Sequence, residues 1–224
     1  MDSQRPAGSR FRSLSRRRSL LAWAERNDAA IVEDDYDSEF RFEARPIEPL
    51  QTLDNKGRVI YVGSFSKTML PTLRLRFVVT PPSIRAAIHR AKQVADWHTS
   101  LPLQMALARF IDDGGFARHI RKMRNIYRVR HDMISNSLTN DFADQLQTVP
   151  STVGLHVAAL ARTASVSEIN AVARRASDVG VQVQTLSRFA VQAPAKAGLV
   201  LGYGAIPAAN IEEGLRWLKL CFVA

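Results

Sequence analysis

Apolar and polar positions follow two different periods along the first half of the chain. Short apolar runs, which are typical of buried strands, occur at residues 30–33, 59–62 and 75–80. Apolar residues spaced three and four apart predict helices at residues 16–26, 84–95, 101–113 and 116–138. Residues 37–57 are rich in proline and turn residues, which predicts a loop.

From residue 149 onward, the second half of the chain again alternates predicted strands with predicted helices. Its predicted strands are residues 153–159, 181–186 and 198–203. Its predicted helices are residues 165–179 and 210–221. Serines stand where helices begin, at Ser13 or Ser15, at Ser83, and at Ser165 or Ser167. Strands interleaved with helices indicate an α/β or α+β architecture.

A short stretch of small polar residues follows the second predicted strand. It contains Ser64, Ser66 and Lys67, and Arg74 comes seven residues after the lysine. Hydroxyl and guanidinium groups can hydrogen-bond a phosphate, and a lysine amine can form a Schiff base with an aldehyde. Taken alone, Lys67 also fits a solvated loop lysine, and Ser66 also fits a plain turn serine.

A carboxylate-rich segment follows the first predicted strand. Asp34 and Tyr36 are two residues apart, so on an extended chain they face the same side, and Asp35 faces the other. A carboxylate beside a ring nitrogen and a phenol beside a ring oxygen are what pyridoxal phosphate needs near its lysine. Asp34 also fits a strand-end residue that caps backbone amides, and Tyr36 also fits a packed aromatic.

The segments 31–40 (IVEDDYDSEF) and 60–76 (IYVGSFSKTMLPTLRLR) together resemble the fold-type I aminotransferase family. The chain is most similar to the aminotransferase-like domain of MocR/GabR-type bacterial regulators, over roughly residues 14 to 221. In that family a GntR-type winged helix-turn-helix precedes the aminotransferase-like domain, which binds pyridoxal phosphate and senses a ligand. The resemblance therefore implies a partial fold-type I large domain plus a smaller α/β C-terminal domain.

The resemblance also assigns roles to individual residues. It implies that Lys67 carries the Schiff base and serves as the catalytic acid and base. Asp34 would pair with the pyridinium nitrogen, and Tyr36 would hydrogen-bond the ring oxygen. The residues that would hold the phosphate are Ser64, Ser66 and Arg74.

The chain departs from the family pattern in two places. The N-terminal half of the family's large domain is absent from this sequence, and a sheet without it is expected to expose apolar surface and an open edge. The origin that the sequence suggests is a truncated or mis-started reading frame. In addition, Val200 stands where aminotransferases carry the arginine that binds the substrate carboxylate. Valine cannot form that ion pair, and a substitute such as Arg188 or Lys196 is not established, so transaminase activity stays open.

Composition narrows the remaining classes of function. The net charge of +10 comes mostly from arginine, and no nucleic-acid motif accompanies it, so exposed arginine-rich helices explain it best. The single cysteine, Cys221, excludes an internal disulfide and fits a cytoplasmic location. No apolar run is long enough to span a membrane. The histidines lack metal-ligand spacing, so no metal site is expected.

The sequence thus predicts a disordered basic segment at residues 1–13. It places a remnant of the cofactor-binding large domain at 14–95 and a small C-terminal aminotransferase domain at 96–224. The leading interpretation is the effector domain of a GntR/MocR-type transcriptional regulator, a homodimer that binds a small amino compound. DNA would be bound only through an N-terminal domain absent from this sequence. The alternatives are a stand-alone class I/II aminotransferase and an inactive fragment.

Overall fold

The computed structural model describes residues 13–41, 48–151, 154–191 and 195–223, which form two compact units. Unit 1 comprises residues 1–39 and 43–121, and unit 2 comprises residues 40–42 and 122–224. The units thus divide between Arg121 and Lys122, whereas the sequence analysis put its domain boundary at residue 96; the domain assignment stays a prediction. The predicted disordered segment 1–13 lies outside the described residues, apart from Ser13.

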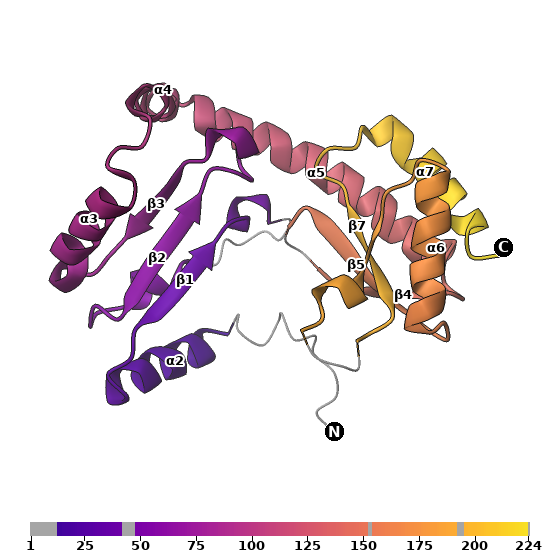
Figure 1. Ribbon diagram of the computed structural model, residues 1–224, viewed down its shortest axis with the longest axis horizontal. Helices are drawn as coiled ribbons and strands as arrows, with labels where there is room; N and C mark the ends of the chain where they lie inside the picture. The colour runs from indigo at the N-terminus through magenta and orange to yellow at the C-terminus, as the bar shows by residue number, and fades with distance from the viewer. Residues whose placement is uncertain (1–12, 42–47, 152–153, 192–194, 224) are drawn as a thin grey trace. The chain divides into compact units, whose positions relative to one another are not determined.

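Unit 1 contains a three-stranded sheet in the order β1-β2-β3, drawn in indigo and purple in Figure 1. Its strands are β1 (Ile31–Asp35), β2 (Val59–Ser64) and β3 (Arg76–Val79). Its helices are α2 (Leu14–Arg26), α3 (Pro82–Asp96) and α4 (Leu101–Asp112), followed by the first turns of α5 (Gly115–Asn140). β1 and β2 are parallel, so their carboxyl ends lie at the same edge of the sheet, and β3 is antiparallel to β2.

Local contacts explain where the elements of unit 1 begin. The Ser13 side chain accepts a hydrogen bond from the Arg16 amide at 3.3 Å, which caps α2 as the sequence predicted. The carboxylate of Asp54 accepts bonds from the backbone N–H groups of Arg58 and Val59 and so fixes the entry into β2. The predicted cap at Ser83 is wrong, because α3 begins one residue earlier at Pro82, where proline suits the first turn of a helix.

The apolar side chains of β3 are exposed, although their sequence is typical of a buried strand. Phe77, Val78 and Val79 are each at least 40% exposed, and Val32 of β1 is more so. Helix α3 buries no residue. This exposure agrees with the expectation that the sheet would present uncovered apolar surface.

Unit 2 contains a four-stranded antiparallel sheet in the order β4-β5-β7-β6. Its strands are β4 (Leu146–Val149), β5 (His156–Ala161), β6 (Gln184–Thr185) and β7 (Gly198–Gly202). Its helices are the rest of α5, α6 (Val166–Asp178) and α7 (Ile211–Leu220). The core residues from these elements include Val157, Ala159, Ile169, Val172, Leu199, Leu215 and Leu218.

The sequence misjudged two strands of unit 2. The predicted strand 181–186 is too long: β6 covers only Gln184–Thr185, residues 181–183 have no regular structure, and a 3-10 helix begins at Leu186. Strand β4 was not predicted at all. Elsewhere, the predicted loop 37–57 contains two short 3-10 helices, Ser38–Phe40 and Leu50–Leu53. Within the described residues, no helix is both long and apolar enough to cross a membrane.

Candidate functional site

The predicted site residues gather at one edge of the unit 1 sheet. The parallel register pairs Asp34 with Val62 and Asp35 with Gly63, so the carboxylates of β1 and the small residues of β2 leave the sheet together. In open sheets of this kind, ligands bind beyond the carboxyl ends of the strands. The antiparallel partner β3 begins at the same edge, since Arg76 pairs with Ser64.

The three acidic residues of β1 have different surroundings. Glu33 accepts hydrogen bonds from the backbone amides of Leu50 and Gln51, at 2.7 and 3.0 Å. Asp35 accepts bonds from the Ser38 hydroxyl at 2.6 Å and from the phenol of Tyr61 at 2.9 Å. Asp34, in contrast, is exposed and makes no hydrogen bond or ion pair within the described part of the chain. Asp34 is therefore the carboxylate of β1 that is available to a ligand.

Tyr36 lies just beyond β1, with its side chain 46% exposed. Its pKa is raised, chiefly by the neighbouring carboxylate of Asp37, then by partial burial, and then by the carboxylate of Asp34. The phenol therefore keeps its proton at neutral pH and can act as a hydrogen-bond donor.

Lys67 lies in a tight turn directly after β2. The turn is closed by a hydrogen bond from the Met69 amide to the Phe65 carbonyl at 2.9 Å. The Ser64 hydroxyl accepts a bond from the Ser66 amide at 3.2 Å. The Lys67 side chain is exposed, and among the described residues its amine forms no hydrogen bond or ion pair. The amine is thus free to react.

The Ser66 hydroxyl oxygen is buried and has no hydrogen-bond partner among the described residues. Buried polar atoms are nearly always paired, so this hydroxyl is a candidate hydrogen-bonding group for a ligand that binds next to Lys67. Within the described residues, no hydrogen bond or ion pair joins Lys67 to Asp34 or Tyr36. The structure therefore brings these side chains to one edge, not into contact.

Arg74 stands where the chain enters β3. Its backbone is left-handed, with φ 53° and ψ 28°, which costs a non-glycine residue about 1 kcal/mol. Its guanidinium group is exposed and forms no ion pair within the described ranges. A hydrogen bond from the Phe65 amide to the Leu75 carbonyl at 3.1 Å links this segment to the start of the lysine turn.

Gly63 is the last residue before the serines, and the ring of Phe77 covers it. A Cβ atom at position 63 would come within 2.3 Å of that ring, so a larger residue requires the ring to move from its present position. The same ring lies 5.5 Å from the ring of Phe65 and 5.9 Å from the ring of Tyr61, between ring centroids.

Val200 lies in the middle of β7, paired with Ala158 of β5 and Gln184 of β6. Its aliphatic side chain offers no positive charge to a carboxylate. Val200 belongs to unit 2, whereas Lys67 belongs to unit 1.

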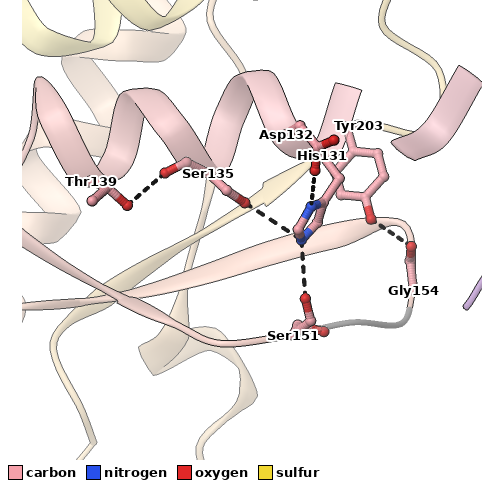
Figure 2. A network of polar contacts seen from close by, with 7 residues as sticks. All are labelled: His131, Asp132, Ser135, Thr139, Ser151, Gly154 and Tyr203. Carbon is pink, nitrogen blue, oxygen red and sulfur yellow. Dashed lines mark hydrogen bonds and ion pairs between the residues drawn. The ribbon is translucent and has the colours of Figure 1, made fainter. Parts of the chain in front are cut away.

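A second polar cluster lies in unit 2 and is shown in Figure 2. The ring Nε2 of His131 lies 3.1 Å from the Ser151 carbonyl, and the Tyr203 phenol donates to the Gly154 carbonyl at 2.6 Å. These bonds link Ser151 to α5 and Gly154 to the residue that follows β7. Among the described residues, no group of three or more His, Cys, Asp or Glu side chains is placed to hold a metal ion.

Sequence reasoning missed one contact near Lys67. His119, one of the histidines for which no metal site is expected, places its ring Nε2 2.9 Å from the Thr68 carbonyl. Nothing in the local pattern indicates this contact, because the two residues are 51 positions apart. The only available signal was the position of His119 on the same helix face as the apolar Phe116, three residues earlier.

Comparison with known families and structures places the chain as a whole. The family model for aminotransferase class I and II matches residues 13–215. A curated relative, the probable rhizopine catabolism regulatory protein MocR of Rhizobium meliloti, is 40% identical over 221 residues. The match covers 99% of this chain and 44% of that regulator, so the chain spans less than half of the relative's length.

Solved aminotransferases share the fold. The kynurenine aminotransferase of Pyrococcus horikoshii, solved with PMP, superposes with a TM-score of 0.83 at 28% identity over 93% of this chain and 51% of that chain. The α-aminoadipate aminotransferase LysN of Thermus thermophilus, complexed with a phosphopyridoxyl-leucine compound, gives 0.83 at 26% identity over 94% and 54%. The fold is therefore that of fold-type I aminotransferases, as the sequence predicted.

Proposed function

The chain belongs to the aminotransferase class I and II family, and on that premise we propose that it is a pyridoxal-phosphate-binding effector domain of a MocR-type transcriptional regulator. The similarity to a curated regulator over nearly the whole chain supports the regulatory part of the proposal. DNA would be bound by a separate winged helix-turn-helix, as in GntR-type regulators. A small amino compound is the proposed effector, the proposed assembly is a homodimer, and the proposed location is the cytoplasm.

The observation that carries the proposal is that the carboxylates of β1 differ in whether they are already hydrogen-bonded. Glu33 and Asp35 are occupied by backbone and side-chain donors, whereas Asp34 and the Lys67 amine are both exposed at the same edge of the sheet. Within the described residues no ion pair joins the two groups, so both are available to a ligand. Pyridoxal phosphate has an aldehyde for the amine and a protonated ring nitrogen for the carboxylate.

The remaining side chains fit the rest of pyridoxal phosphate. The buried, unpaired hydroxyl of Ser66 and the exposed guanidinium of Arg74 offer donors to a phosphate, and Ser64 adds a second hydroxyl. The phenol of Tyr36, which is protonated at neutral pH, offers a donor to the ring oxygen. When bound, the cofactor would supply an electron-withdrawing ring beside the substrate carbon.

The chain's own groups would act in three ways. The Lys67 amine would hold the aldehyde carbon and afterwards carry a proton to or from the bound amino compound. Asp34 would pair with the ring nitrogen and keep it protonated, and Arg74 would anchor the phosphate with its planar fork. These groups suffice for ligand sensing, while catalytic turnover also needs a group that binds the substrate carboxylate.

The proposal is tested by adding pyridoxal phosphate to the purified chain and recording its visible absorption, followed by borohydride reduction and mass spectrometry. Wild type should gain a new absorption band and a reduced adduct on Lys67, and Lys67→Ala should gain neither. Lys56→Ala is the matched control, because Lys56 is an exposed lysine of the same unit that pairs with Glu25. Absence of the band in a folded wild-type chain, or an adduct on another lysine, would overturn the cofactor assignment.

A stand-alone aminotransferase is the second candidate, favoured by the similarity to solved aminotransferases at a TM-score of 0.83. Stopped-flow mixing of the cofactor-loaded chain with amino acids would distinguish the two. An enzyme would convert an amino acid to its 2-oxo acid over many turnovers, whereas a sensor domain would show a spectral change without turnover. An inactive fragment, the third possibility, would show no cooperative unfolding.

A further inference from the structure

The turn that carries Lys67 is held on its amino-terminal side by the backbone of Phe65. The Phe65 carbonyl accepts from the Met69 amide at 2.9 Å, and the Phe65 amide donates to the Leu75 carbonyl at 3.1 Å. The ring of Phe65 also packs edge-on against the ring of Phe116 in α5, with centroids 5.8 Å apart. The residue before the Ser66-Lys67 pair is therefore fixed by three contacts.

On the carboxyl-terminal side, the neighbour of Lys67 is Thr68, which is only 1% exposed. Its hydroxyl has no hydrogen-bond partner among the described residues, so the side chain does not anchor the turn by a polar bond. Its carbonyl oxygen lies 2.9 Å from the ring Nε2 of His119. A carbonyl oxygen only accepts, so Nε2 must carry the proton and donate.

His119 and Phe116 are three residues apart on α5, which puts them on one face of the helix. Both belong to unit 1 together with the Lys67 turn. One helix face therefore contacts the turn on both sides of Lys67, through a ring at Phe65 and through a hydrogen bond at Thr68. The lysine side chain itself has no hydrogen bond or ion pair among the described residues that would fix it, so its placement depends on the backbone.

We propose that His119 is a positioning residue for Lys67, which holds the Thr68 carbonyl so that the amine meets the cofactor aldehyde. This inference rests on the proposed function, because it assigns His119 a part in cofactor capture. Without the donor, the Thr68 carbonyl is unpaired and the turn has more than one arrangement available. The amine must then be ordered when the cofactor binds, which weakens binding.

The test compares two substitutions at the same position. His119→Gln keeps an N–H donor on a side chain of similar reach, whereas His119→Met keeps the size and removes the donor. His89→Met is the control, since His89 is an exposed histidine on α3 of the same unit. Absorbance titration with pyridoxal phosphate gives the Kd of each variant, and borohydride trapping gives the fraction of Lys67 captured.

We expect the Kd of His119→Met to rise about tenfold, which corresponds to the loss of roughly one hydrogen bond. His119→Gln should stay within about threefold of wild type, and His89→Met should match wild type. A purely structural role would instead lower the urea midpoint of the cofactor-free chain with the Kd unchanged. A folded His119→Met that binds as tightly as wild type, or a His119→Gln as weak as His119→Met, would overturn the proposal.

Hydrogen exchange of the cofactor-free chain separates this inference from the proposed function. The Met69 amide, which closes the turn, should exchange about fivefold faster in His119→Met than in wild type and at the wild-type rate in His119→Gln. Wild type could capture no cofactor while the Met69 amide still exchanges faster in His119→Met than in the other two proteins. In that case the proposed function fails and the role of His119 in placing Lys67 stands. Equal exchange in all three proteins would refute that role.

Discussion

The two sheets of the molecule contain similar apolar residues, but these are buried in one sheet and exposed in the other. In unit 2, Val157 of β5 is 1% exposed, and its neighbours on β7 are buried with it. In unit 1, Val78 of β3 is 47% exposed, although Phe77 and Val79 on either side are equally apolar. Unit 2 thus encloses a core of its own, while the sheet of unit 1, which carries the candidate site residues, leaves apolar side chains exposed. Apolar sequence predicts where a strand forms, and the surrounding elements decide whether that strand is buried.

The sharpest way to test this comparison is to remove the same two methyl groups from each sheet. Val157→Ala should lower the free energy of unfolding by about 2 kcal/mol, because burial and packing are both lost. Val78→Ala should lower it by less than about 0.5 kcal/mol, because its side chain is half exposed. Urea unfolding followed by circular dichroism measures both. Equal losses would mean that β3 is covered in solution.

The next largest difference in stability between the units is expected for one tyrosine from each, Tyr203 and Tyr36. Tyr203→Phe in unit 2 removes the donor to the Gly154 carbonyl, a buried bond of 2.6 Å, and should cost about 1 to 2 kcal/mol. Tyr36→Phe in unit 1 should leave stability unchanged, since the Tyr36 phenol forms no hydrogen bond among the described residues. Thermal unfolding of the two variants measures the contrast. A destabilised Tyr36→Phe would show that this phenol has a structural partner.

Tyr61 gives unit 1 a pH dependence at the alkaline end. Burial, followed by the bond to Asp35, raises the pKa of Tyr61 above its ordinary value of 10.0, so the folded state favours the protonated phenol. The resulting stability is present in full below pH 10 and is lost as pH rises above it. We expect Tyr61→Phe to be less stable than wild type by about 1 kcal/mol at pH 7.

The measurement is urea unfolding of wild type and Tyr61→Phe at neutral pH and at several values above the ordinary tyrosine pKa of 10.0. The gap between the two proteins should shrink as pH rises through that range. A gap that stays constant would mean that Tyr61 does not ionise differently in the folded and unfolded states.

The smallest effect is expected at the start of α6 in unit 2. The Glu168 carboxylate accepts bonds from the hydroxyl and the backbone amide of Ser165, which lower the pKa of Glu168. Its contribution to stability is therefore present above the ordinary pKa of 4.5 and is lost as pH falls below it. Glu168→Gln should unfold at a slightly lower temperature than wild type at neutral pH and at the same temperature in acid, where the carboxylate is protonated. A difference that persists in acid would contradict this assignment.

Elements with strong local signals could be predicted from the sequence. The helix α6 follows from its apolar spacing, its cap at Ser165 and its end before Gly180, which has a left-handed backbone. Strands β1 and β2 follow from short apolar runs that end in polar residues. Strand β4 could not be predicted, because only Leu146 of its four residues is buried and its pairing with β5 is a tertiary contact.

The sequence nominates a set of site residues, which stays a prediction, but it does not give their arrangement. The motif around Lys67 and the acidic segment of β1 indicate their chemistry by residue type. Their common edge depends on the parallel pairing of β1 with β2, and the sequence does not show which strands pair. The bond from His119 to Thr68 joins residues 51 positions apart and was invisible for the same reason.

The contact between Gly63 and Phe77 limits how this site can change over evolutionary time. Since a Cβ atom at position 63 would lie 2.3 Å from the Phe77 ring, a substitution there requires the ring to move aside or to be replaced by a smaller side chain. A change at position 77 would also remove one of the two aromatic neighbours of Phe65, two residues before Lys67. The two positions are therefore expected to vary together among relatives.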